Sequence, residues 1–260
     1  MIRGLYASGW SMIANGRKMD VIANNIANVN TNGYKKDSVI FESFPELLVK
    51  RVNDYRSIAN PSGLIGTMEI SSDVGEVFTY YQQGKVTRTG NRLDFAIHHD
   101  TGSSFFTIGV QEPDGGINEF YTRDGAFTVN PDGFLVTREG YLVMGQNGPI
   151  QLQNNQFTVL EDGSIVVNGE AVDRFLIRSF ANTDSLREVG MNLVSTTEQT
   201  QEQQFNGKVL QEFVEESNVN IIREMVDMIT VLRAYEANQK MVQIQDGTLE
   251  KAVNEVGAVR

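Results

Sequence analysis

The stretch "DVIANNIANVNTNGYKK", residues Asp20 to Lys36, decides how the first part of this chain folds. It begins with the spacing of an amphipathic helix and then fills with asparagine, whose side chain competes with the helix for backbone hydrogen bonds. The pair Asn32-Gly33 closes it, because glycine readily takes the left-handed conformation found just past a helix end. We predict a helix that stops there and is completed by neighbouring subunits. The amides predicted to contact those subunits are Asn24, Asn25, Asn28 and Asn30.

Upstream of this stretch, apolar and small residues recur at alternating spacings of three and four, which is the a and d pattern of a coiled coil. Gly9 and Gly16 lie on this line, so a partner helix could approach closely there. Each interior glycine costs roughly 1 kcal/mol relative to alanine, so the isolated helix should be weak and need a partner. The predicted subunit contacts on this line are Leu5, Met12, Met19 and Ile26.

Residues 217–256 repeat the heptad pattern more strongly. Ser217 or Asn218 is a suitable N-cap, and Arg223-Glu224 is interpreted as the beginning of the exposed face. A second apolar edge widens the stripe at its start and leaves room for more than one neighbour; it consists of Ile222, Val226 and Ile229. The predicted subunit contacts on the main line are Ile221, Met225, Met228, Leu232, Tyr235, Val242, Leu249 and Val253.

The middle of the chain is β in character. Short β-prone runs between residues 70 and 205 are separated by Asp-Gly and Asn-Gly pairs, the strongest local signals for hairpins. Residues 37–69 look like an extended connector, and the polar residues 182–210 return the chain to its last helix. We predict an α+β fold in which residues 1–36 pair with 217–260 as a coiled-coil domain. An antiparallel all-β domain, residues 70–216, is inserted between them.

Composition excludes several classes of function. The formal net charge of −11 disfavours nucleic acid and anionic membranes as partners, and no run is apolar enough for direct membrane insertion. The chain has no cysteine, so disulfides, thiolate catalysis and cysteine-based zinc sites are excluded. The N-terminus lacks the features of a cleaved secretory signal, so any export should use another route.

No catalytic, cofactor or metal site is predicted. His98 and His99 are adjacent on what looks like a strand end, so their side chains should point to opposite faces. The Asp-Gly pairs lack the acidic spacing of a calcium loop and are explained by hairpin turns. Carboxylate pairs such as Glu161-Asp162 lie at turns, and no phosphate loop or nucleophile elbow is present. We therefore expect a protein that is not an enzyme.

Four motifs, taken together, resemble the rod and hook proteins of the bacterial flagellar basal body. "MDVIANNIANVNTNGYKK" is similar to that family's N-terminal signature, and "SNVNIIREMVDMITVLRAYEANQKMVQ" is similar to its C-terminal one. "RTGNRLDFAI" and "YTRDGAFTVNPDGFLVTREGYLVMG" resemble signatures of its β domain. The resemblance covers nearly the whole chain in the correct order. The ends look most like the distal-rod member and the middle like the proximal-rod member.

The resemblance implies that the paired helices form an inner domain and the β domain lies outside it. It also implies a structural subunit that polymerises helically into the hollow drive shaft of the rod, which transmits torque from motor to hook. The implied partners are further copies of the chain, adjacent rod and hook proteins, and the flagellar type III export apparatus. The implied location is the basal body, where the exported rod spans the periplasm or the cell wall.

Two alternatives are kept open. The first is a hook or hook-junction subunit of the same family. The second, from a different class, is a β protein that binds cell-wall carbohydrate and has helical dimerisation arms.

Overall fold

The computed structural model describes residues 2–43, 46–50, 64–68, 72–99, 103–111, 116–152, 157–190 and 192–256. The chain forms two compact units. The first, which we call the helical unit, comprises residues 1–26, 37–78 and 221–260. The second, the β unit, comprises residues 27–36 and 79–220. The chain therefore passes between the units several times.

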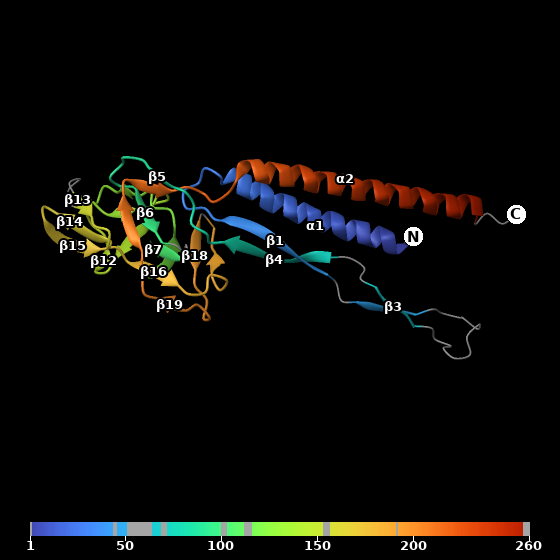
Figure 1. Cartoon of the computed structure of the whole chain (residues 1–260), viewed down its shortest axis with the longest axis horizontal. Helices are drawn as coiled ribbons and strands as arrows, with labels where there is room; N and C mark the ends of the chain where they lie inside the picture. The colour runs from blue at the N-terminus through green and yellow to red at the C-terminus, as the bar shows by residue number, and fades with distance from the viewer. Residues whose placement is uncertain are drawn as a thin grey trace. The chain divides into compact units, whose positions relative to one another are not determined.

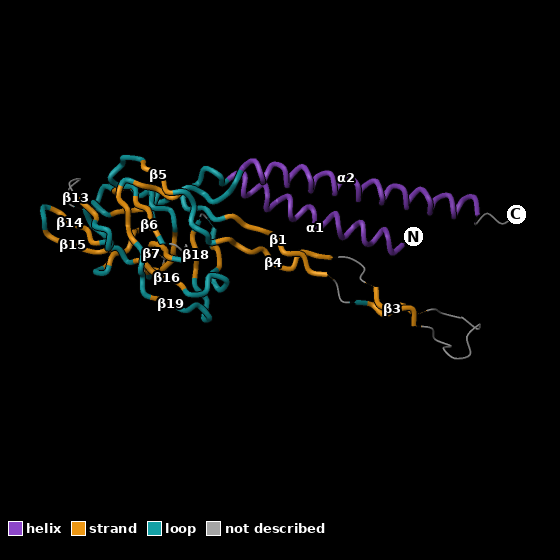
Figure 2. The backbone as a smooth tube through the Cα atoms, in the orientation of Figure 1, coloured by secondary structure: helices purple, strands orange, loops and turns teal. Residues whose placement is uncertain are grey.

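The helical unit is built on two long helices, α1 (Ile2–Ala27) and α2 (Ile221–Lys251), and α2 continues into a π-helical turn, Ala252–Val256. The helices run side by side in opposite directions (Figures 1 and 2). A Cβ on Gly4 would lie 2.5 Å from the Gln245 amide nitrogen, and Asn25 donates a hydrogen bond to Glu224. These contacts occur near opposite ends of the pair. They confirm that the N- and C-terminal helices pack together.

Helix α1 ends at Ala27, earlier than the predicted stop at Asn32-Gly33. The residues that follow form two successive turns, in which Thr31 N–H donates to the Asn28 carbonyl (3.1 Å) and Tyr34 N–H to the Thr31 carbonyl (3.4 Å). Gly33 has a φ of +70°, and a Cβ there would lie 2.5 Å from backbone atoms of Arg123 and Asp124. Glycine is required at this turn by conformation and by close approach, but it is not the helix cap.

Helix α2 begins at Ile221, so the residue before it is Asn220 and the predicted N-caps Ser217 and Asn218 are wrong. The Asn218 side chain has another role, since its Oδ1 accepts a hydrogen bond from Lys36 N–H at 2.7 Å. A sequence pattern cannot distinguish such a long-range bond from a cap, because both use the same short polar side chain.

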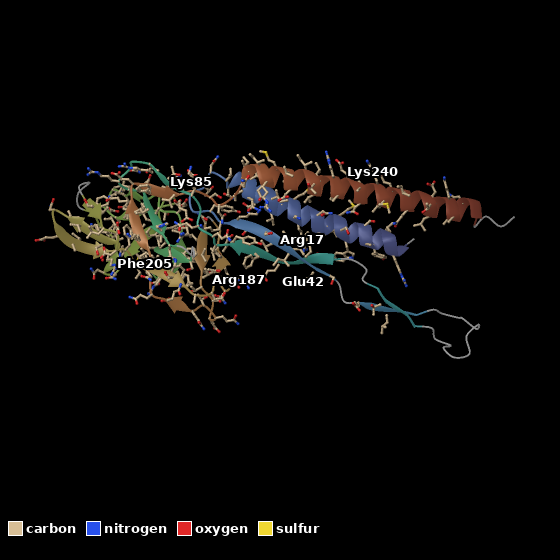
Figure 3. The ribbon with its side chains drawn as sticks, in the orientation of Figure 1. Arg17, Glu42, Lys85, Arg187, Phe205 and Lys240 are labelled. Atoms are coloured by element: carbon tan, nitrogen blue, oxygen red, sulfur yellow. The ribbon has the colours of Figure 1, made fainter. Side chains whose placement is uncertain are left out.

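The helical unit also contains strands. β1 (Lys36–Ser43) pairs with β4 (Ser72–Tyr80), and β2 (Leu47–Lys50) pairs with β3 (Leu64–Met68). The Arg17 guanidinium lies 3.6 Å from the Asp73 carboxylate, and the Lys18 ammonium lies 5.5 Å from the Phe41 ring centroid. The β1–β4 ribbon therefore packs along α1, where Figure 3 labels Arg17 and Glu42. The described part of residues 37–69, predicted as an extended connector, consists of strands β1, β2 and β3.

The β unit is antiparallel throughout its recorded pairings, which confirms the predicted α+β class. Its largest sheet has the order β17-β18-β8-β7-β11-β10-β9, with β12 beside β11 and β16 joining β7 to β19. Strands β13-β14-β15 form a separate sheet, and β6 pairs with β20 and β5 with β21. The bounds are β5 (Val86–Arg88), β6 (Phe95–His98), β7 (Ser104–Gln111), β8 (Ile117–Thr122), β9 (Thr128–Val129), β10 (Leu135–Val136), β11 (Leu142–Gly145), β12 (Gly148–Pro149), β13 (Phe157–Val159), β14 (Ser164–Val167), β15 (Glu170–Arg174), β16 (Ile177–Phe180), β17 (Arg187–Glu188), β18 (Leu193–Ser195), β19 (Glu202–Gln203), β20 (Lys208–Gln211) and β21 (Phe213–Glu215).

Aromatic rings fill the centre of the β unit. The rings of Phe95 and Phe175 have centroids 5.0 Å apart, and Phe106 packs edge-on against Phe127 at 5.3 Å. All four side chains are buried. The hairpins around this core use the predicted turns. Between β14 and β15, for example, Asn168 and Gly169 have φ of +54° and +90°, the two positive values that a type I′ turn requires.

Candidate assembly interface

Asn25 joins three elements of the helical unit. Its Nδ2 donates to the backbone carbonyl of Asp37 (2.8 Å) and to the carboxylate of Glu224 (3.3 Å), and its Oδ1 accepts from Asp37 N–H (3.0 Å). Asn25 is 1% exposed and Glu224 is 1% exposed. One amide thus connects α1 to the first residues of β1 and to the first turn of α2. A buried, fully bonded amide of this kind fixes the geometry of its neighbours.

The other asparagines of the motif lie in different surroundings. Asn24 and Asn30 are exposed, whereas Asn28 is half-buried and its Oδ1 accepts from the Thr31 hydroxyl at 3.1 Å. The structure thus gives Asn25 an internal role and gives Asn28 a bond within its own turn. Subunit contact remains a prediction, and the exposed Asn24 and Asn30 are the amides best placed for it.

Glu224 was interpreted from sequence as part of the exposed face, and this was wrong. Its carboxylate is buried on a line of α2 that also contains Met228, Val231 and Tyr235. The charge misled the interpretation, because glutamate is rarely fully buried without a partner. The available signal was its heptad spacing to Met228 and Val231, which places it on the inner side of the helix.

On α1, the predicted contact residues are only partly covered. Leu5, Met12, Met19 and Ile26 are all half-buried. The most buried side chains of the helix lie on neighbouring positions and are Ser8, Ala14, Ile22 and Asn25. A third line faces outward and carries exposed aromatic and aliphatic side chains, namely Tyr6, Trp10 and Ile13.

On α2, the predicted contact residues divide into two sets. Met228, Tyr235, Val242 and Leu249 are half-buried, whereas Ile221, Met225, Leu232 and Val253 are exposed. The second apolar edge is exposed as well and consists of Ile222, Val226 and Ile229. A helix rotates by about 100° per residue, so pairing with one neighbour covers only part of a broad apolar stripe. Contiguous exposed apolar surface of this kind is typical of an interaction site.

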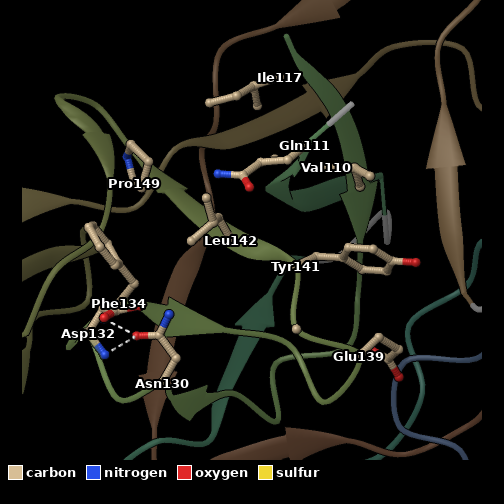
Figure 4. Close-up of a pocket in the computed structure, with 12 residues that line it drawn as sticks. Val110, Gln111, Ile117, Asn130, Asp132, Phe134, Glu139, Tyr141, Leu142 and Pro149 are labelled. Carbon is tan, nitrogen blue, oxygen red and sulfur yellow. Dashed lines mark hydrogen bonds between the residues drawn. The ribbon is translucent and has the colours of Figure 1, made fainter. Parts of the chain in front are cut away.

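The β unit carries a depression of about 470 Å³ on its largest sheet (Figure 4). Asn130 lies at its edge, but its Oδ1 accepts hydrogen bonds from Asp132 N–H (3.1 Å) and Phe134 N–H (2.8 Å). The Asn130 side chain therefore serves a turn.

The two histidines lie at the end of β6. Gln83 contacts both, since its Nε2 is 3.4 Å from His98 Nδ1 and its Oε1 accepts from His99 N–H at 3.2 Å. Within the described residues, no three histidine or acidic side chains gather as metal ligands would. Neither helix in the described part of the chain is long and apolar enough to cross a bilayer.

Three family models match the chain in the order of its elements. The flagella basal body rod protein model matches residues 5–35, and the FlgE/F/G hook-protein D1 domain model matches residues 101–167. The C-terminal model of the flagellar basal body rod FlgEFG proteins matches residues 210–255. The first and last of these models cover most of α1 and α2.

Relatives match over nearly full length. The flagellar basal-body rod protein FlgG of Buchnera aphidicola subsp. Baizongia pistaciae (strain Bp) is 36% identical over 96% of this chain and 98% of its own. FlgG of Bacillus subtilis (strain 168) is 33% identical over 98% of this chain and 99% of its own. The rod protein FlgF of Rhizobium meliloti (strain 1021) is 32% identical over all of both chains. The chain therefore belongs to the flagellar basal-body rod protein family.

Proposed function

We propose that this protein is a structural subunit of the flagellar basal-body rod and polymerises helically into a hollow shaft that transmits torque from motor to hook. It works by assembly and does no enzymatic chemistry. The observation that carries the proposal is the exposed apolar surface of α1 and α2, in a chain related to rod proteins over nearly its full length.

Hydrophobic burial drives the assembly. The exposed side chains on α2 include Met225 and Leu232, which are 49% and 45% exposed, and α1 adds Tyr6 and Ile13. Covering such surface with neighbouring subunits contributes about 25 cal/mol for each Å² of apolar area removed from water. Contacts between unlike surfaces that do not close into a ring generate an open helical assembly, which is the symmetry of a tube.

Polar groups define the register of the subunits. An apolar stripe gives affinity but tolerates sliding, whereas an amide buried in a wrong register loses its partner at a cost of roughly 1–3 kcal/mol. Asn24 and Asn30 are exposed on and just after α1, so they are the amides that would meet a neighbour. Asn25 acts within one subunit, where it fixes α1 to β1 and α2.

The remaining partners follow from the family. We infer contacts with adjacent rod and hook proteins at the two ends of the shaft, and delivery by the flagellar type III export apparatus. The location is the basal-body rod, across the periplasm or the cell wall according to the cell envelope.

Deletion of the gene tests this function. Loss of the protein should abolish motility and leave basal bodies that stop within the rod when purified and viewed by electron microscopy. Return of the gene should restore complete hook-basal bodies. A deletion strain with a complete rod and no hook would identify a hook or hook-junction subunit instead. A fully motile deletion strain would contradict both assignments.

A further inference from the structure

Three segments of the β unit lead directly into the helical unit. Residues 27–36 lie between α1 and the rest of β1, residue 79 follows the helical-unit part of β4, and residue 220 precedes α2. Any force carried by the backbone from one unit to the other must pass through these segments. Within the β unit, polar side chains hold all three together.

Glu215, at the end of β21, is the first of these side chains and is 1% exposed. One carboxylate oxygen accepts two hydrogen bonds, one from the Lys35 ammonium and one from Gly84 N–H at 2.8 Å. The other oxygen accepts from Arg123 Nε at 2.9 Å. The backbone carbonyl of Glu215 also accepts from Gly33 N–H at 2.7 Å.

Asn218 is the second side chain and touches each segment in turn. Its Oδ1 accepts from Lys36 N–H at 2.7 Å, and its Nδ2 donates to the carbonyls of Tyr80 (2.8 Å) and Gln82 (3.2 Å). The Gln82 carbonyl also accepts from the Lys35 ammonium at 2.8 Å. We call Lys35, Arg123, Glu215 and Asn218 the junction cluster.

Burying the charged side chains of the junction cluster costs free energy. The side chains of Lys35, Arg123 and Glu215 are 3%, 1% and 1% exposed. Burial lowers the pKa of Lys35 to about 8, although the Glu215 carboxylate raises it in opposition. Burial likewise lowers the pKa of Arg123. Buried ion pairs of this kind contribute little net stability, and in some proteins they are retained because they specify one geometry.

We propose that Glu215 and Asn218 are positioning residues for rod assembly, which fix in one place the three segments that connect the β unit to the assembling helices. This inference deepens the proposed function and rests on it. Arg123 anchors the cluster to the core, since it also donates to the backbone carbonyls of Ser104 and Ile97. Asn218 holds the segments without touching that core, so it is the residue to change.

Hydrogen exchange on the purified full-length protein tests the inference. Asn218→Ala removes one acceptor and two donated bonds, so residues 27–36, 79–85 and 216–220 should exchange roughly ten- to a hundredfold faster. Exchange in β7, residues 104–111, should be unchanged. Asn218→Asp keeps the oxygen that accepts from Lys36, so it should retain protection of the Lys36 amide.

The matched control is Ser217→Ala. Ser217 is the half-buried neighbour of Asn218, and its hydroxyl accepts a local bond from Val219 N–H at 3.3 Å. This variant should exchange like the wild type in residues 27–36 and 79–85, and in residues 216–220 only the Val219 amide should exchange faster. Wild-type exchange in Asn218→Ala would contradict the inference. So would faster exchange in β7 to the same degree, because Asn218 would then serve general stability.

A test in cells separates this inference from the proposed function. In a strain lacking the gene, the wild type and Ser217→Ala should restore motility, and Asn218→Ala should restore it poorly despite normal protein levels. Full motility of Asn218→Ala, together with faster hydrogen exchange in the three segments, would overturn the positioning role. If the wild-type gene itself forms no rods, the proposed function fails, and the exchange data still decide whether the cluster holds the segments.

Discussion

The two units of this protein differ in how much of their apolar side chains they bury. The β unit buries a continuous aromatic and aliphatic core, in which Phe95, Phe106 and Ile108 are fully inaccessible. In α2, by contrast, only Glu224 and Val231 are buried, and a row of isoleucine, methionine and leucine side chains is exposed. The β unit has a buried core of its own, whereas the helical unit leaves apolar surface exposed, which we propose serves assembly.

The largest effect is expected at the buried carboxylate of the β unit. Glu215→Gln leaves the Lys35 and Arg123 cations without a counter-ion, which should lower the free energy of unfolding by about 3–5 kcal/mol. Thermal unfolding followed by circular dichroism measures the loss. The control is Glu212→Gln, which removes an exposed pair with Arg88 and should cost at most about 1 kcal/mol. Equal losses in the two variants would show that Glu215 is not an essential counter-ion of the buried cations.

Two adjacent residues of α2 test the helical unit. Val231 is 5% exposed and Leu232 is 45% exposed. Val231→Ser should destabilise the pairing of the helices by roughly 2–3 kcal/mol, because it places a hydroxyl in an apolar contact. Leu232→Ser should leave the monomer unchanged and yet prevent rod formation. Hydrogen exchange of α2 and counts of basal bodies provide the two measurements, and the reverse pattern would refute the assignment of faces.

Asn25 and Asn24 form a second adjacent pair. Asn25→Ala should cost about 1–3 kcal/mol in the helical unit, because the Asp37 amide and carbonyl and the Glu224 carboxylate each lose a partner. The β-sheet signal in circular dichroism should not change. Asn24→Ala changes an exposed side chain, so it should cost the helical unit less than Asn25→Ala and still reduce assembly. Faster exchange of α1 amides in Asn24→Ala than in Asn25→Ala would reverse the roles given to these residues.

The smallest effect is a pH dependence of the β unit. Burial raises the pKa of Asp124 from 3.8 to about 6, so the native chain binds more protons than the unfolded chain between these values. Its contribution to stability is therefore complete below pH 3.8 and is lost as the pH rises through 6. Asp124→Asn should increase stability at pH 7 by about 1–2 kcal/mol and leave it unchanged near pH 3.5. Chemical unfolding of both proteins across this pH range measures the difference in their free energies of unfolding. A difference that does not change with pH would contradict the raised pKa of Asp124.

Local sequence patterns predicted the two helices, the hairpins and the α+β class. Features that depend on long-range contacts, such as the end of α1, were not predicted. The heptads at the two ends gave both helices, and Asn168-Gly169 gave a hairpin, because these signals depend on neighbours in sequence. The end of α1 was placed too late, since Gly33 adopts its left-handed conformation against Arg123 rather than at the helix cap.

The site was harder to predict than the fold. A heptad pattern defines an apolar stripe, but it does not show which edge of the stripe the partner helix covers. The covered line of α2 therefore differs from the predicted line by one residue at every second position. Glu224 and Glu215 were missed because each is buried by partners that are distant in sequence: Asn25 for the first, Lys35 and Arg123 for the second. No local pattern contains those pairings.

We propose that neighbouring subunits cover the exposed apolar line of α2, and the absence of cysteine from the chain makes a direct test possible. Leu232→Cys introduces a single thiol whose reaction with a maleimide can be followed in dilute monomer and in rods isolated from motile cells. We expect rapid labelling of the monomer, protection in the intact rod, and labelling again after the rod is dissociated. Equal labelling of the intact rod and the monomer would show that this face is not a subunit contact.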